Sequence, residues 1–295
     1  MADGTITQVD RGDGKVVATI QVSDPGVLRS QGCAPDSVHS YYSGSWSYRT
    51  CDTPYALAWD GSSLWALDNG RHEVVRIDPA SHEVVDHVAL PDTQQADVQH
   101  GVVFGWSMIA GGGTLWVSGY AQHSLFGIDI KSRRLVSVET DLDPGPTTLA
   151  YAAGAVWVVT VRGINGIAYL DRVDPATTKV VGRFPIEWWS EAITADQGAI
   201  YVRGSFGGDI ALIDVTTGAV VWTEPGPGFI GRQGIDELGA TSTGIWMSGP
   251  STVRIDLKTG LIADRIPIPS ASVAAEGAEV WLSELNGTVA EYRWK

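Results

Sequence analysis

The chain repeats one pattern of short apolar segments along almost its whole length. Each repeat holds an apolar segment, a tight turn, a segment centred on tryptophan or tyrosine, a segment ending in Ile-Asp or Val-Asp, and a fourth segment after a polar turn. The aromatic segments lie at residues 64–67, 115–117, 156–159, 200–202, 245–247 and 280–282. The terminal aspartates, whose side chains favour turns by accepting nearby backbone hydrogen bonds, are Asp78, Asp129, Asp174, Asp214 and Asp256. The pattern predicts four antiparallel strands per repeat.

The two ends of the chain hold complementary parts of this repeat. Residues 5–10 end in Val-Asp like a third strand and residues 15–20 follow as a fourth, whereas residues 272–295 supply inner strands around Trp281. Radial repetition of such units defines a β-propeller, which leaves only short edges. We therefore predict one all-β domain over residues 1–295, with six four-stranded blades and a ring closed by N- and C-terminal strands that share a blade. Residues 288–293 compete with residues 5–10 for the third place in that blade, and seven blades are the alternative.

Repeats such as residues 64–90 and 245–266 resemble the YVTN, NHL and virginiamycin B lyase-like propeller group. The segment His100-Gly101-Val102 is similar to the place in virginiamycin B lyase-like proteins where a histidine precedes an inner strand. The segment from Trp281 to Glu284 is similar to their aromatic-x-Thr-Glu strand end. That family uses histidine, glutamate and a divalent cation to open a lactone by elimination. The resemblance implies His100 as a base and Glu284 as its partner.

Strand alternation sorts the connections onto two faces. The first-to-second and third-to-fourth connections are short, whereas the opposite face receives the long segments 23–54, 91–105, 139–147 and 224–238. We expect function on the long-loop face, because loops on a rigid frame commonly carry binding and catalytic groups.

The insertion at residues 23–54 carries both cysteines of the chain, Cys33 and Cys51. We predict a disulfide between them, worth about 3 kcal/mol in a chain-entropy model. Such a bond needs an oxidising compartment, so we expect a secreted or otherwise extracytoplasmic protein, with no signal peptide in residues 1–295. The alternative is two unrelated thiols or a weak metal pair.

The long loops combine aromatic, acidic and basic residues, a composition typical of a small-molecule pocket. Proton transfer is assigned to His100 with Glu284, or to Glu191 with Asp236, and stabilisation of negative charge to Arg203 or Arg232. The expected substrate-binding residues are Tyr41, Tyr42, Trp46, Tyr48, Trp106, His123, Trp188, Trp189, Phe206 and Phe229. The alternative for any one of them is packing between blades or a solvated rim.

Composition narrows the choice of function. A net charge of −14, from 34 acidic and 20 basic residues, argues against nucleic acid and anionic membranes as partners. No apolar run reaches the roughly 20 residues of a membrane span. We expect a monomer that acts on a small, apolar or aromatic molecule.

Two hypotheses about function stay open. No GxSxG, HExxH or P-loop motif occurs, which favours a lyase, cyclase or isomerase over an acyl-enzyme hydrolase. No cofactor is assigned, and Mg²⁺ or Ca²⁺ held by loop carboxylates is the one considered. The second hypothesis is a noncatalytic secreted propeller that binds a glycan, a peptide or a partner protein through the same face. The enzyme is favoured because the long loops concentrate histidine, carboxylates and arginines rather than aromatics alone.

Overall fold

The computed structural model is built from β-strands throughout its described residues. These residues are 4–9, 15–24, 56–68, 71–91, 107–119, 123–139, 142, 145–161, 168–186, 190–196, 199–204, 209–224, 238–241, 244–248, 251–267, 270–276, 279–284 and 289–293. No described range contains a helix that is long and apolar enough to cross a membrane.

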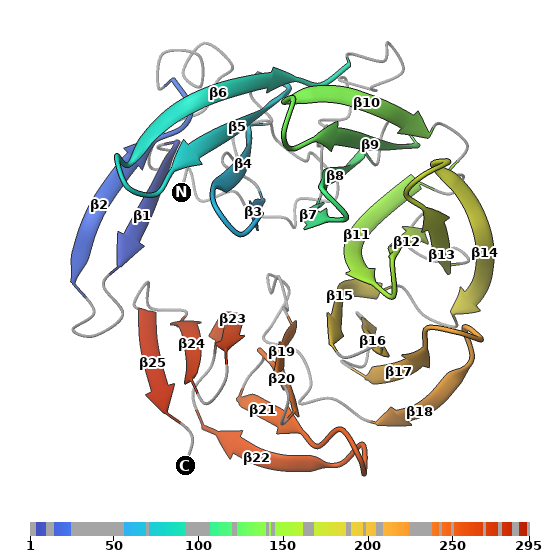
Figure 1. The fold of residues 1–295 in the computed structure, drawn as a ribbon. Coiled ribbons are helices and arrows are strands. Elements are labelled where there is room, and N and C mark those ends of the chain that lie inside the picture. The colour runs from blue at the N-terminus through green and yellow to red at the C-terminus, as the bar shows by residue number, and fades with distance from the viewer. Residues whose placement is uncertain are drawn as a thin grey trace, which may run out of the picture. The chain divides into compact units, whose positions relative to one another are not determined.

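Five four-stranded sheets follow one another along the chain, each with its strands paired in sequence order (Figure 1). The first holds β3 (Leu57–Trp59), β4 (Leu64–Asp68), β5 (Glu73–Asp78) and β6 (Glu83–Ala89). The second holds β7 (Ser107–Gly111), β8 (Thr114–Gly119), β9 (Ser124–Asp129) and β10 (Arg134–Glu139). The third holds β11 (Gly145–Ala152), β12 (Ala155–Val161), β13 (Ala168–Asp174) and β14 (Lys179–Ile186).

The fourth sheet holds β15 (Ser190–Asp196), β16 (Ala199–Gly204), β17 (Ile210–Asp214) and β18 (Val220–Glu224). The fifth holds β19 (Leu238–Thr241), β20 (Gly244–Met247), β21 (Thr252–Ile255) and β22 (Ile262–Ile266). A sixth, three-stranded sheet holds β23 (Ser270–Glu276), β24 (Glu279–Glu284) and β25 (Val289–Arg293). The repeated sheets are the blades of a β-propeller, and six of them carry the predicted aromatic strand. The predicted loop at 139–147 is shorter than expected, because β11 already begins at Gly145.

The aromatic residue of each repeat lies on the second strand of its sheet. Five of these side chains are buried, namely Trp65, Trp116, Trp157, Tyr201 and Trp246. Burying a tryptophan removes about 200 Å² from water, which stabilises the folded state by roughly 5 kcal/mol before entropy is counted. Outer strands such as β6 instead alternate exposed and half-buried residues, as expected for an edge with one solvated face.

The third-to-fourth turns share one geometry in five sheets. The residue four positions after the strand-ending Asp donates its N–H to that Asp carbonyl oxygen, as Thr178 does to Asp174 at 2.7 Å. This residue always has a positive φ, and it is His82, Arg133, Thr178, Gly218 or Gly260. Because three of the five are not glycine, the turn itself tolerates a side chain at this position.

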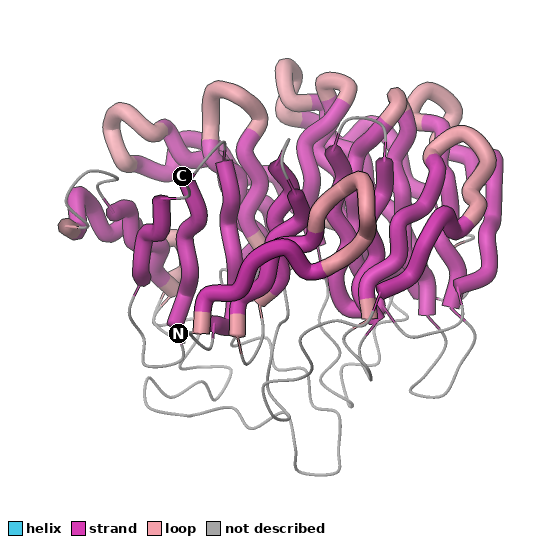
Figure 2. The backbone as a smooth tube through the Cα atoms, turned by 90° about the horizontal axis from the view of Figure 1, so that it is seen from below, coloured by secondary structure: helices cyan, strands magenta, loops and turns pink. Residues whose placement is uncertain are grey.

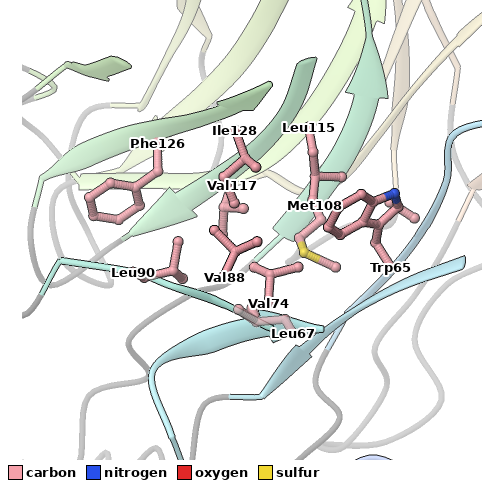
Figure 3. Packing of buried hydrophobic residues seen from close by; sticks show 11 residues of the cluster. Trp65, Leu67, Val74, Val88, Leu90, Met108, Leu115, Val117, Phe126 and Ile128 are labelled. Atoms are coloured by element: carbon pink, nitrogen blue, oxygen red, sulfur yellow. The ribbon is translucent and has the colours of Figure 1, made fainter. Parts of the chain in front are cut away.

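The chain divides into two compact units, residues 1–149 with 174–179, and residues 150–173 with 180–295. In the first unit, side chains of the first and second sheets form one apolar cluster that includes Trp65, Leu67, Val117 and Phe126 (Figure 3). In the second unit, Trp157, Leu170, Val202 and Ile213 belong to a corresponding cluster. The expectation of a single domain over residues 1–295 stays a prediction.

The terminal strands take defined places. β1 (Thr5–Val9) pairs with β2 (Val16–Gln21), and Ile20 and Val22 pack against Val75 and Ile77 of the first sheet. At the other terminus β25 pairs with β24, so Val289–Arg293 occupies the third position in the sixth sheet. Of the two segments that competed for this place, the C-terminal one holds it.

Candidate functional site

Because neighbouring strands are antiparallel, the start of the first strand and the close of the second strand lie on the same side of each repeated sheet. We call this side the loop-side end. The short turns that join first to second and third to fourth strands lie at the opposite, turn-side end; described turns are pink in Figure 2. This confirms, sheet by sheet, the predicted sorting of short connections.

Most predicted site residues lie outside the described part of the chain, and their roles stay predictions. They are His100, Arg232, Asp236, Tyr41, Tyr42, Trp46, Tyr48, Trp106, Trp188, Trp189, Phe206, Phe229, Cys33 and Cys51. The structure places Glu191, Arg203, Glu284 and His123 on or beside strands.

Glu191 occupies a β-bulge at the loop-side end of β15. Ser190 pairs with Gly204 and Ala192 with Arg203, so Glu191 is the extra residue between two consecutive residues of β16. A bulge bends its strand and changes the direction of a side chain, and bulges are frequent beside active sites.

Glu284 lies next to a second bulge of the same kind. It pairs with Ser270, whereas Ser283 pairs with Ser272, which leaves Ala271 as the extra residue at the start of β23. The first strands of the last three sheets are neighbours, since β19 contacts both β15 and β23. Glu191 and Glu284 therefore share the loop-side end of one group of sheets in the second unit.

Arg203 pairs with Ala192, next to the bulge at Glu191. Its side chain is almost fully buried, with 1% of its surface exposed. Its Nη1 donates a hydrogen bond of 2.8 Å to the carbonyl oxygen of Ser248, which directly follows β20. The guanidinium thus connects the fourth sheet to the fifth. A buried charge is costly unless it is well partnered, so this contact is part of what allows an arginine here. The predicted role of Arg203 in stabilising negative charge stays a prediction.

His123 is exposed and immediately precedes β9 at a loop-side end. Its φ is 50°, and its carbonyl oxygen accepts a hydrogen bond of 3.2 Å from Leu142 N–H. His72 repeats this arrangement before β5, with a φ of 53° and a 2.8 Å bond from Leu90 N–H. The main chain of both histidines ties the start of a third strand to the segment after the fourth.

Polar side chains are fully buried at or near the loop-side ends of second strands, and of these the sequence analysis had named only Arg203. The others are Asp68, Ser118, Thr160 and Ser248. Ser118 Oγ accepts a 3.0 Å bond from Ser107 N–H and donates a 2.5 Å bond to the Thr147 carbonyl oxygen. The signal available in the sequence was a polar residue two or three positions after the aromatic residue of each repeat.

The carboxylates with displaced pKa values lie at the turn-side end and belong to the scaffold. For Asp60, burial raises the pKa, but hydrogen bonds from Trp65 Nε1, Ser63 and Ser62 outweigh it, and the net pKa is lowered. The Trp65 bond is 2.7 Å long. It anchors the buried indole to its turn.

The described residues do not by themselves fit the divalent cation that the resemblance implies. Within them, no group of three or more His, Cys, Asp or Glu side chains is arranged to hold a metal ion. We therefore derive no chemical step through a metal.

Comparisons with solved structures define the class of the fold. The chain resembles virginiamycin B lyase from Staphylococcus aureus in two structures, a catalytically inactive variant with quinupristin (TM-score 0.70) and a selenomethionine-substituted protein (TM-score 0.71). Each is 13% identical, over 99% of this chain and 89% of that chain. Kuenenia stuttgartiensis hydrazine synthase gives a TM-score of 0.70 at 14% identity, over 98% of this chain and 89% of that one.

At such identities the likeness shows the fold alone. It confirms the architecture expected from the YVTN, NHL and virginiamycin B lyase-like group. No protein-family model matches the chain, and no curated protein matches it in sequence.

Proposed function

We propose that this chain is a small-molecule enzyme of the lyase, cyclase or isomerase type, with acid–base chemistry at the loop-side end of its last three sheets. The observation that carries the proposal is the placement of Glu191 and Glu284 at one end of neighbouring sheets, each at a strand pairing interrupted by a bulge. The likeness to virginiamycin B lyase supports the choice of reaction class.

The reaction that fits these acidic and basic residues is the opening of a lactone by elimination. A carboxylate removes the proton from the carbon next to a carbonyl, that electron pair forms a double bond to the neighbouring carbon, and the alkyl C–O bond of the ester on that neighbouring carbon breaks. The ring opens to an alkene and a carboxylate without consuming water. Glu284, or Glu191 with Asp236 as its proton partner, supplies the base, and Arg232 stabilises the negative charge that develops.

The test is mass spectrometry of a panel of macrocyclic lactones, including quinupristin, after incubation with the purified chain. Elimination gives a linear product of unchanged mass, whereas hydrolysis adds one water. We expect the wild-type product to have the same mass as the lactone. We expect Glu191→Gln or Glu284→Gln to lower the rate about 10²-fold. The matched control is Glu279→Gln, at the turn-side end of the same strand as Glu284.

A protein that retains a panel molecule in native mass spectrometry but never converts it would contradict the enzyme and favour the noncatalytic binding protein. Turnover that survives both glutamate substitutions would contradict the placement of the site.

A further inference from the structure

The loop-side end of β16 is held to the main chain on both sides. On one side, the Arg203–Gly204 segment pairs across the bulge that contains Glu191. On the other, Gly204 N–H donates a 2.8 Å hydrogen bond to the carbonyl oxygen of Asp209, which directly precedes β17. Any movement of this strand end would therefore shift the main chain at Glu191.

Ser118 shows what this position does in a regular sheet. Like Arg203, it comes two residues after the aromatic residue of its repeat, and it hydrogen-bonds both to Ser107 directly opposite and to Thr147 of β11. β7 and β8 pair without a bulge at this end. A short neutral side chain is thus enough to hold a regular strand end.

The fourth sheet differs from this regular pairing, because the bulge at Glu191 lies opposite the end of β16. An extra residue disrupts the ladder locally and leaves an unpaired position, so the start of β15 is held less firmly by β16. Arg203 has a longer reach than serine, and its buried guanidinium donates to the main chain of the adjacent sheet at Ser248. A hydrogen bond from a charged donor is also stronger than one from a hydroxyl.

We propose that Arg203 is a positioning residue: through its hydrogen bond to the Ser248 carbonyl oxygen it fixes the loop-side end of β16, and with it the bulge that carries Glu191. Arg203 then acts through the main chain rather than by touching the substrate, which agrees with its burial. The inference rests on the proposed function for the identity of the site, but the mechanical role can be measured without any substrate.

The test compares Arg203→Met and Arg203→Lys in the full chain by amide hydrogen exchange. Loss of a hydrogen bond from a charged donor should speed exchange at residues 190–193 at least about tenfold in the Met variant. Lys keeps a charged donor and should restore most of the protection. Arg76→Met, which removes an arginine from β5 in the first unit, is the control and should leave exchange at residues 190–193 unchanged.

A second readout uses quinupristin as the probe. If the wild-type chain converts it, Arg203→Met should lower kcat about tenfold with little change in KM, and Arg203→Lys should recover most of the rate. If the wild-type chain does not convert it, the proposed function loses support, and the exchange data still decide the role of Arg203.

The proposal would be overturned if Arg203→Met left amide exchange at residues 190–193 unchanged. It would also be overturned if exchange became faster to the same extent throughout the second unit. Should the Met variant fail to fold, Arg203→Gln, which has a shorter and uncharged side chain, takes its place: faster exchange confined to residues 190–193 supports the role, and wild-type exchange there contradicts it.

Discussion

The ring of Phe184, on β14, lies so close over the α-carbon of Gly218 that a methyl group added to this glycine would overlap the ring. Gly218 occupies the positive-φ position of the β17–β18 turn, which His82, Arg133 and Thr178 fill in other sheets. The turn conformation therefore does not require glycine at this position. Glycine is required because the Phe184 ring of the preceding sheet leaves no room for a side chain.

Gly218→Ala should consequently destabilise the protein more than the backbone conformation alone explains. Gly154 is the matched control, because it has nearly the same φ, 71° against 70°, and open space around it. We expect Gly154→Ala to cost about 1 kcal/mol and Gly218→Ala a further 1 to 3 kcal/mol, roughly, from overpacking. Chemical denaturation measures both. Removing the ring with Phe184→Ala should bring the cost of Gly218→Ala down to that of the control, and equal costs in its presence would contradict the contact.

Asp86 accepts hydrogen bonds from two arginines that differ in how far they are exposed to solvent. Its Oδ2 lies 2.6 Å from Arg76 Nη2 on the adjacent strand and 3.3 Å from Arg133 Nη1 in the next sheet. Arg76 is the more buried of the two, with 24% of its side chain exposed against 47% for Arg133. Double-mutant cycles should give a coupling energy of about 1 kcal/mol for Arg76 and less than about 0.5 kcal/mol for Arg133. The reverse order would show that the contact between sheets is the stronger one.

The lowered pKa values of the strand-ending aspartates predict how the free energy of unfolding depends on pH. Hydrogen bonds from Thr217 N–H, Thr217 Oγ1 and Thr216 N–H lower the pKa of Asp214 below its ordinary value of 3.8, and Thr259 N–H, Thr259 Oγ1 and Lys258 N–H do the same for Asp256. Because the folded pKa is the lower one, each carboxylate stabilises the fold fully above about pH 4. This contribution is lost as the pH falls through the folded pKa.

The measurement is the free energy of unfolding between pH 6 and pH 3, for the wild type and for Asp214→Asn with Asp256→Asn. Asparagine cannot ionise, so the double variant should lose less stability on acidification than the wild type. Parallel curves would contradict the assigned hydrogen bonds. Thr217→Val should raise the pKa of Asp214 by removing one of the donors.

The cysteine pair gives a prediction that depends on the sequence alone. Cys33 and Cys51 lie outside the described residues, and a disulfide between them should lower the denatured, nonreduced mass by two hydrogens. Protein purified from an oxidising compartment is the sample to measure, with reduced protein as the reference. Two free thiols in that sample would remove the argument for an extracytoplasmic location.

The repeat could be read from the sequence because its signals are local. The aromatic residue on each second strand and the Asp at the end of each third strand recur at nearly fixed spacing, and both lie where expected, as Trp157 and Asp174 show. The competition between the two terminal segments could not be decided in this way. Residues 5–9 and 289–293 have similar alternation, and only their partners distinguish them.

The details of the candidate site were beyond sequence reasoning for a different reason. An arginine near the end of a strand resembles an exposed residue, and Ser248, which accepts its hydrogen bond, lies 45 positions away in the sequence. The bulge at Glu191 has no glycine or proline to mark it. Such features arise from long-range pairing, which the local pattern of apolar and polar residues does not encode.

Acid–base chemistry at the loop-side end of the last three sheets can be measured with the lactone panel. The wild type and Glu279→Gln should give ring-opened product of unchanged mass, and Glu191→Gln or Glu284→Gln should lower the rate about 10²-fold. Binding without conversion across the panel, or wild-type rates in both glutamate variants, would contradict it.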